Sequence, residues 1–201
     1  MKRLRILGII GIAVAGLFCQ VAYSADSAAN TTSAPAPTKA SVESYRTAAE
    51  QGDAAAQFKL GLCYIKGTGV PHDLPEGVIW LRKAAAQGNA EAEFNLGVAY
   101  EQGIAVEKDQ REAVKWYLKA AAQGNSDSQF NLGRCYVKGE GVAQDWHEAA
   151  TWFRKAAEQG HADAQCKLGF CYATGKGMEP DQREAVKWFR QAAERGNVDG
   201  Q

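Results

Sequence analysis

The feature that most constrains this chain is an internal repeat with a strict period of 36 residues. A repeat of this length holds one supersecondary unit, which buries its apolar faces only by stacking on further copies. The recurring positions are Gly52, Gly88, Gly124, Gly160 and Gly196; Leu60, Leu96, Leu132 and Leu168; Tyr64, Tyr100, Tyr136 and Tyr172; and Trp80, Trp116, Trp152 and Trp188. They predict a solenoid of about four repeats, at 53–88, 89–124, 125–160 and 161–196, with a half repeat at 41–52 in front and the start of an incomplete repeat at 197–201.

Each repeat carries the start and stop signals of two helices. The first helix follows a short polar residue such as Asn89 and ends at a glycine-bearing loop. The second begins at Asp73, Asp109, Asp145 or Asp181, each followed three residues later by Glu, which predicts a reciprocal capping box. Gly124 and its equivalents then end the second helix in a left-handed conformation. Gly61 and its equivalents lie within the first helix, which predicts a close approach of two helices there.

The first residues of the chain are typical of an export signal. Lys2, Arg3 and Arg5 precede the apolar run 6–18, and small residues before Ala25 fit a cleavage site. The run is shorter than a bilayer-spanning helix, so residues 1–24 are interpreted as a cleaved signal peptide, with an uncleaved anchor as the alternative. Residues 25–40 contain Ala, Ser, Thr and Pro without large apolar side chains, and we expect a flexible linker. The protein is thus predicted to be exported, periplasmic or secreted, from a bacterium, with no membrane span after cleavage.

The charge balance argues against one class of partner. The chain has 23 basic and 23 acidic residues and a formal net charge of zero. Proteins that bind nucleic acid carry a basic excess on the binding face, so no nucleic-acid partner is expected.

The sequence shows no pattern typical of a catalytic, cofactor or metal site. The three histidines, His72, His147 and His161, occupy different repeat positions and lack metal-ligand spacing. The Gly-x-Gly loops follow helices, whereas a dinucleotide-binding loop follows a strand. No serine precedes a lysine by three positions, as serine β-lactamases require. The chain is therefore predicted to be no enzyme and to bind neither cofactor nor metal.

Four cysteines lie in the repeats: Cys63, Cys135, Cys166 and Cys171. Packed helices lie about 8–10 Å apart, whereas a disulfide needs Cα atoms within about 7 Å. We therefore expect buried thiols that act as small hydrophobic residues.

The motif Leu96-Gly97-x-x-Tyr100, followed by Ala113, Tyr117 and Ala120, is similar to the tetratricopeptide signature, but the period and the loop are longer. The stretches AEAEFNLGVAYEQG and EAVKWYLKAAAQGN resemble the Sel-one-like repeat family over about residues 41–201. The resemblance implies a right-handed α/α solenoid, or superhelix, that binds other proteins as an adaptor or scaffold. Some cysteine-rich relatives are linked to β-lactam binding and hydrolysis, but their paired cysteines at the helix ends are missing here.

In superhelices of this kind the first helix of each repeat lines the concave face, so the resemblance also implies candidate binding residues. These are Leu62, Lys66, Phe94, Val98, Gln102, Phe130, Arg134, Lys138 and Phe170. An apolar row beside Lys and Arg suits an extended or helical peptide with acidic character. Phe94 and Phe130 have an alternative role in the core. Trp146 has no tryptophan at its equivalent positions and is either an exposed contact or packed on its own loop.

The sequence thus predicts an exported, non-enzymatic scaffold that binds a protein or peptide in its concave groove. The alternative from another class is an envelope hydrolase or a binder of cell-wall fragments, like the β-lactam-linked relatives. A third is assembly through the last helix, whose Trp188 and Phe189 lack a following repeat to cover them.

Overall fold

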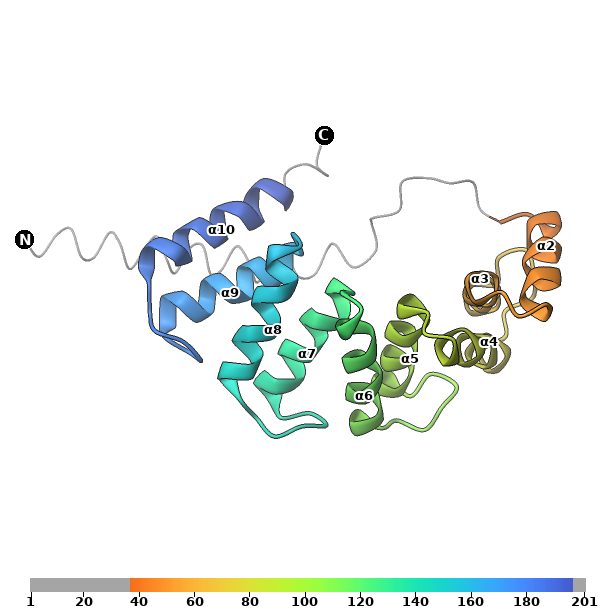
Figure 1. The fold of residues 1–201 in the computed structure, drawn as a ribbon, viewed down its shortest axis with the longest axis horizontal. Helices are drawn as coiled ribbons and strands as arrows, with labels where there is room; N and C mark the ends of the chain where they lie inside the picture. Colours follow the sequence, from red (N-terminus) through yellow and green to blue (C-terminus); the bar gives the residue numbers. More distant parts are fainter. Residues whose placement is uncertain (1–36, 197–201) are drawn as a thin grey trace, which may run out of the picture. The chain divides into compact units, whose positions relative to one another are not determined.

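The computed structural model describes residues 37–196, and within this range the chain forms nine α-helices and no strand. They are α2 (Lys39–Glu50), α3 (Ala54–Lys66), α4 (Leu74–Ala86), α5 (Ala90–Gln102), α6 (Gln110–Ala122), α7 (Ser126–Lys138), α8 (Trp146–Glu158), α9 (Ala162–Thr174) and α10 (Gln182–Gly196). The described helices fall into two compact units, α2–α7 before Asp145 and α8–α10 from Asp145 onward. Within each unit the main packing partners are helices adjacent in the chain (Figure 1).

The N-terminal half repeat forms a single helix that starts slightly earlier than predicted. Thr38 caps α2 by accepting a hydrogen bond from the Ser41 amide, so the last two residues of the predicted linker are helical. The predicted signal peptide, the rest of that linker up to residue 36 and the predicted repeat start at 197–201 lie outside the described residues. No helix between residues 37 and 196 has both the length and the apolar character needed to span a membrane.

The second helix of each repeat begins at the predicted aspartate, but only half of the capping box forms. The Asp109 carboxylate accepts from the Glu112 amide at 3.0 Å, and Asp73, Asp145 and Asp181 accept equivalent bonds. A reciprocal box also needs a return bond from the aspartate amide to the glutamate side chain. The Asp109 amide donates to the Tyr100 carbonyl instead. Asp73 and Asp181 make the same backbone bond to Tyr64 and Tyr172. The prediction of a reciprocal box was therefore wrong at these three positions, because the preceding helix supplies the acceptor.

The first helices are capped by Asp53, Asn89 and Asn125, as predicted, and α9 is capped by a histidine. Nδ1 of His161 accepts from the Ala164 amide at 3.2 Å, which requires that this nitrogen carry no proton. The first helices end at left-handed glycines, and a second glycine in the loop also has positive φ in three of the four loops. In the 103–109 loop that second position is Ala105, at φ 53°.

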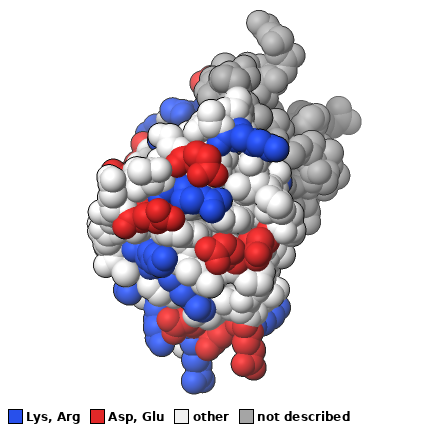
Figure 2. All heavy atoms as spheres, turned by 90° about the vertical axis from the view of Figure 1, so that its right-hand side faces the viewer, with Lys and Arg blue, Asp and Glu red and all other residues white. Residues whose placement is uncertain are grey.

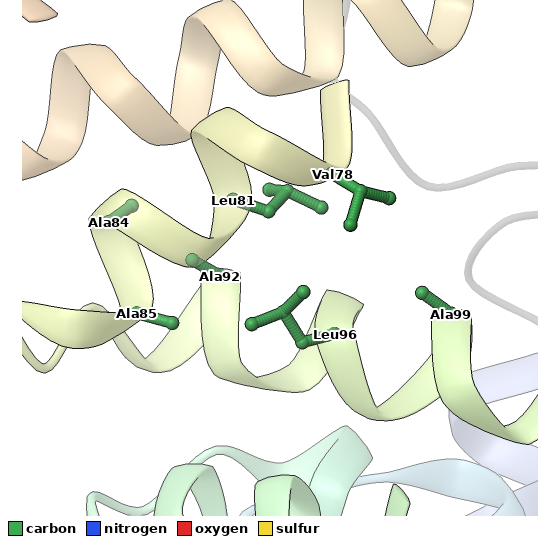
Figure 3. Packing of buried hydrophobic residues seen from close by; sticks show 7 residues of the cluster. All are labelled: Val78, Leu81, Ala84, Ala85, Ala92, Leu96 and Ala99. Carbon is green, nitrogen blue, oxygen red and sulfur yellow. The ribbon is translucent and has the colours of Figure 1, made fainter. Parts of the chain in front are cut away.

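Within each unit the core consists mainly of leucine and alanine from helices that are adjacent in the chain. Leu60, Leu96, Leu132 and Leu168 are fully buried. Figure 3 shows Leu81 and Val78 of α4 pointing toward Leu96 and the alanines of α5. The mid-helix glycines permit this packing, as predicted: a Cβ on Gly97 would collide with the Tyr117 ring, and one on Gly169 would lie 3.0 Å from the Phe189 ring.

A buried polar residue lies at the same position of each first helix, and in three of the four it bonds to the helix before it. The Gln57 amide donates to the Ala49 carbonyl at 3.0 Å, and Gln129 and Gln165 bond to Ala121 and Ala157 in the same way. Glu93 takes this place in α5 and instead accepts a 2.8 Å bond from the Gln123 amide. Burial raises the pKa of Glu93, an effect opposed by the Gln123 bond and by Lys119.

Candidate binding surface

The histidines, cysteines and carboxylates of the described residues form no metal-binding group. In residues 37–196 no cluster of three or more His, Cys, Asp or Glu side chains is arranged to hold a metal ion. Cys63, Cys135, Cys166 and Cys171 form no disulfide in this part of the chain. Three of these thiols are buried as predicted, whereas Cys166 is half-buried. Burial raises the pKa of Cys135 and of Cys171 to about 11, which makes both thiols weak nucleophiles.

The predicted binding residues of α3, α5 and α7 differ in exposure. Leu62, Val98 and Arg134 occupy equivalent repeat positions and are all half-buried. Lys66, Gln102 and Lys138 lie one turn further along these helices and are exposed, and the Lys138 ammonium lies 3.5 Å from Glu140. A row of partly exposed side chains beside exposed polar ones therefore follows the first helices of this unit.

The predicted aromatic residues do not all belong to that surface. Phe130 is buried, so it serves the core, which was its alternative role. Phe94 is half-buried, and its ring centroid lies 6.2 Å from that of Tyr117. Of Phe94 and Phe130, therefore, only Phe94 keeps some exposed surface.

A polar group that sequence reasoning missed crosses this unit. Nη2 of Arg134 lies 3.6 Å from Oε1 of Glu101, and Nη1 donates to Asn131 at 3.0 Å. The other carboxylate oxygen of Glu101 accepts from the Tyr117 hydroxyl. The signal was present, since Glu101 replaces Ile65 and Val137, and Arg134 replaces Leu62 and Val98, at their repeat positions. Glu101 and Arg134 introduce opposite charges at two different repeat positions, and the repeat pattern alone did not indicate that these positions are neighbours.

The remaining predicted residue, Phe170, lies in the other unit, next to a second aromatic residue. Its side chain is 39% exposed, and its ring centroid lies 6.4 Å from that of Trp146. The Lys176 ammonium lies 4.4 Å from the Trp146 centroid and 5.5 Å from the Phe170 centroid. Trp146 therefore contacts Lys176 in the loop after α9. The prediction that Trp146 packs on the loop preceding it did not include this contact.

An open hollow lies beside the loop after α5. It is lined by Arg82, Tyr100 and residues 105–109. The Arg82 guanidinium donates to the Tyr100 hydroxyl at 3.0 Å and so closes part of the wall. In the equivalent loop of the next repeat, Gly141 lies directly against the Gln110 carbonyl, where a Cβ would collide. The alanine at 105 thus occupies a position at which Gly69, Gly141 and Gly177 touch the rest of the protein.

On the face that Figure 2 presents, the charged side chains are mixed rather than separated by sign. Figure 2 shows basic and acidic residues alternating over the face it presents, with uncharged surface between them. Such a face produces no strong field of one sign, as the balanced composition predicts.

Comparison with known proteins identifies the repeat. The Sel1 repeat model matches residues 54–89, 90–125, 126–161 and 162–197. A protective antigen present in uropathogenic Escherichia coli strains, with an SLR fold, is 43% identical and superposes with a TM-score of 0.75. That match covers 78% of this chain but only 34% of the antigen, so this chain spans about a third of its length.

Two further solved structures agree. A Sel1 repeat protein from Oxalobacter formigenes is 34% identical with a TM-score of 0.73, over 91% of this chain and 73% of that one. A Klebsiella pneumoniae protein described as a Sel1 repeat protein is 26% identical with a TM-score of 0.53, over 76% and 73% of the two chains. No curated protein matches the chain at a significant level. The predicted fold class, an all-α helical repeat solenoid, is confirmed by these matches.

Proposed function

This chain belongs to the Sel1 repeat family, and from that premise we propose that it is an exported, non-enzymatic scaffold that binds a protein or peptide through the first helices of its repeats. Sel1 repeat proteins often act as scaffolds for protein interactions. The partner surface comprises Leu62, Val98 and Arg134 with the flanking Lys66, Gln102 and Lys138, and in the other unit Phe170.

The observation that carries the proposal is the partial exposure of one repeat position. Leu62 and Val98 are apolar, yet each keeps solvent-accessible surface where the fully buried Leu60 and Leu96 lie only two residues earlier. A row of half-buried apolar side chains beside flexible cations offers an apolar anchor and polar rim contacts, as peptide-binding surfaces do.

Export and the absence of catalysis have separate support. The basic residues at the start, the apolar run and the small residues before Ala25 are typical of a signal peptide, and the solved relatives named above are bacterial. The buried thiols with raised pKa values are unsuited to nucleophilic chemistry. A periplasmic or extracellular protein is thus the partner class that we propose.

The test compares two pairs of substitutions that the repeat itself supplies. Leu62→Arg with Val98→Arg introduces the residue found at the equivalent position 134. Ile79→Lys with Leu118→Arg removes exposed apolar side chains from the second helices and introduces the residues found at equivalent positions 115 and 82. Partners are captured on the full chain from a bacterial envelope extract, identified by mass spectrometry, purified and titrated by calorimetry.

We expect the first pair to weaken the affinity of the purified partner by at least about tenfold, and the second pair to leave it unchanged. Both pairs should retain the helical circular-dichroism spectrum of the native chain. Loss of affinity only in the second pair would overturn the proposed surface and place binding on the second helices.

A further inference from the structure

We propose that Trp146, Phe170 and Lys176 form a specificity site for a peptide segment in which an apolar side chain lies beside a carboxylate. The inference rests on the proposed function, because it states the chemistry of the peptide that the scaffold selects. All three residues lie in the unit that begins at Asp145.

The site combines an exposed aromatic surface with a cation. Phe170 is among the most exposed large apolar residues of the described chain, at 39%, and Trp146 is half-buried beside it. Their rings are inclined by 40°, so together they form an angled wall rather than a flat stack. The exposed ammonium of Lys176 lies over the Trp146 ring. An aliphatic or aromatic side chain placed against Phe170 would therefore have a positive charge next to it.

The three residues depart together from the repeat pattern. Trp146 stands where the other repeats have Leu74, Gln110 and Gln182; Phe170 where they have Leu62, Val98 and Arg134; and Lys176 where they have Thr68, Ile104 and Glu140. Gln182 donates to the Ala173 carbonyl at 3.0 Å, and Gln110 makes a longer bond to Glu101. In two other repeats the glutamine at this position thus bonds to the backbone of the preceding helix. Trp146 replaces this polar side chain with aromatic surface.

The backbone holds the site in place. Nδ1 of His147 lies 3.1 Å from the Gly177 carbonyl oxygen, and the Gly177 Cα lies so close to the Trp146 carbonyl that a Cβ would collide with it. The residue after Lys176 is therefore fixed to the start of the helix that carries Trp146. A site that is ordered before binding loses less conformational entropy when the ligand arrives.

The charge of the site favours an acidic ligand. The Lys176 ammonium has no ion-pair partner among residues 37–196, whereas Lys115, Lys138 and Lys187 each face a glutamate. Lys167 adds a second exposed cation on the same helix as Phe170, and the charges of Lys167 and Lys176 both oppose the burial that raises the pKa of Cys171. A carboxylate beside the apolar side chain of the ligand would complement this local positive potential.

The experiment selects 12-residue peptides from a random phage-displayed library on the full chain and measures the affinity of the enriched peptides by fluorescence anisotropy. The variants are Trp146→Gln and Lys176→Glu, each of which introduces the residue of another repeat. The control is the Ile79→Lys, Leu118→Arg pair. Thermal melting of every variant separates a loss of binding from a loss of structure.

We expect enriched peptides to carry Asp or Glu next to Leu, Phe or Trp, and each variant to weaken their binding by at least about tenfold. A peptide with Lys in place of its acidic residue should bind Lys176→Glu better than it binds the native chain. Peptides that bind Trp146→Gln as tightly as the native chain would overturn this site, and loss of their binding in the Leu62→Arg, Val98→Arg pair would still support the proposed function. If no peptide is enriched and no partner is captured from the envelope extract, both proposals are wrong.

Discussion

The hydroxyl of Tyr117 donates a 2.6 Å hydrogen bond to the carboxylate of Glu101 and so links α6 to α5. Tyr117 is fully buried, and its pKa is raised by burial and by the Glu101 carboxylate. The Arg134 guanidinium of α7 faces the other oxygen of that carboxylate. A single carboxylate thus connects three helices from two repeats.

Replacing Tyr117 by Phe should lower the free energy of unfolding by about 2 kcal/mol, because a hydrogen bond to a charged group is lost. Phe153 and Phe189 occupy the equivalent positions, so the ring itself fits the site. Urea denaturation measures the change. Combining Tyr117→Phe with Glu101→Val, the residue found at 137, should cost less than the sum of the two single substitutions. Additive costs would mean that the bond contributes nothing.

Gly97→Ala should destabilise the chain by about 1–3 kcal/mol, because its Cβ would enter the space of the Tyr117 ring. Gly77→Ala is the matched control within a helix. There a Cβ would meet Cγ1 of Ile65 at 2.6 Å and the Gly61 carbonyl oxygen at 3.0 Å, but the equivalent residues Ala113, Ala149 and Ala185 show that the fold holds an alanine at this repeat position. The control should therefore cost less stability than Gly97→Ala, where the colliding group is a fully buried ring. Thermal unfolding of both variants checks the contrast, and equal melting temperatures would refute it.

Glu93→Gln should stabilise the protein near neutral pH by about 1 kcal/mol, because glutamine can donate as Gln57 does. The pKa of Glu93 is raised above its ordinary value of 4.5 in the folded chain, so the protonated form favours folding. The stability due to this group is complete below pH 4.5 and is lost as the pH rises through the raised pKa. The advantage of the glutamine variant should therefore shrink toward acid pH. Urea denaturation at pH 4 and at pH 7 would show this, and an advantage independent of pH would contradict it.

Ala105→Gly should raise the free energy of unfolding by up to about 1 kcal/mol. Ala105 has a φ of 53°, a left-handed conformation that costs a residue with a Cβ about 1–2 kcal/mol, partly offset by the greater freedom of glycine in the unfolded chain. The opposite change at the equivalent position, Gly141→Ala, should be strongly destabilising because of the Gln110 carbonyl. Differential scanning calorimetry of both variants measures the two effects, and a lower melting temperature for Ala105→Gly would be evidence against strain at this position.

Among the cysteines of residues 37–196, the half-buried Cys166 should react first with iodoacetamide at pH 8. Cys135 and Cys171 are buried and have pKa values of about 11, so only about one thiol in a thousand is ionised at that pH. Peptide mapping of the labelled native protein gives the order. Labelling of Cys171 as fast as Cys166 would show that α9 opens readily.

Features that repeat along the chain could be predicted, because each of them is determined by a few neighbouring residues. The helix caps at Asp73 and Asn89 and the close approach at Gly97 are of this kind. What could not be predicted depends on which residues meet across helices. The Asp109 amide finds the Tyr100 carbonyl instead of Glu112, although the local sequence fits a reciprocal box equally well.

The candidate surface shows the same division. The repeat period alone places Leu62, Val98 and Arg134 at one position. It also predicts the same environment for Phe94 and Phe130, although only Phe130 of these two is buried. The neighbourhood of Trp146 with Phe170 and Lys176 joins residues far apart in the chain and is not a consequence of any short motif.

The packing of each helix mainly on its chain neighbours has a consequence for the history of the molecule. A gene duplication that inserts one more 36-residue unit would need no new core, because both faces of the copy meet partners of a kind already present. The copy could then diverge at positions whose side chains take no part in the contacts that all repeats share. Trp146 of one repeat and Phe170 and Lys176 of the next lie at such positions, so two neighbouring repeats can acquire a new ligand preference while the other repeats preserve the architecture.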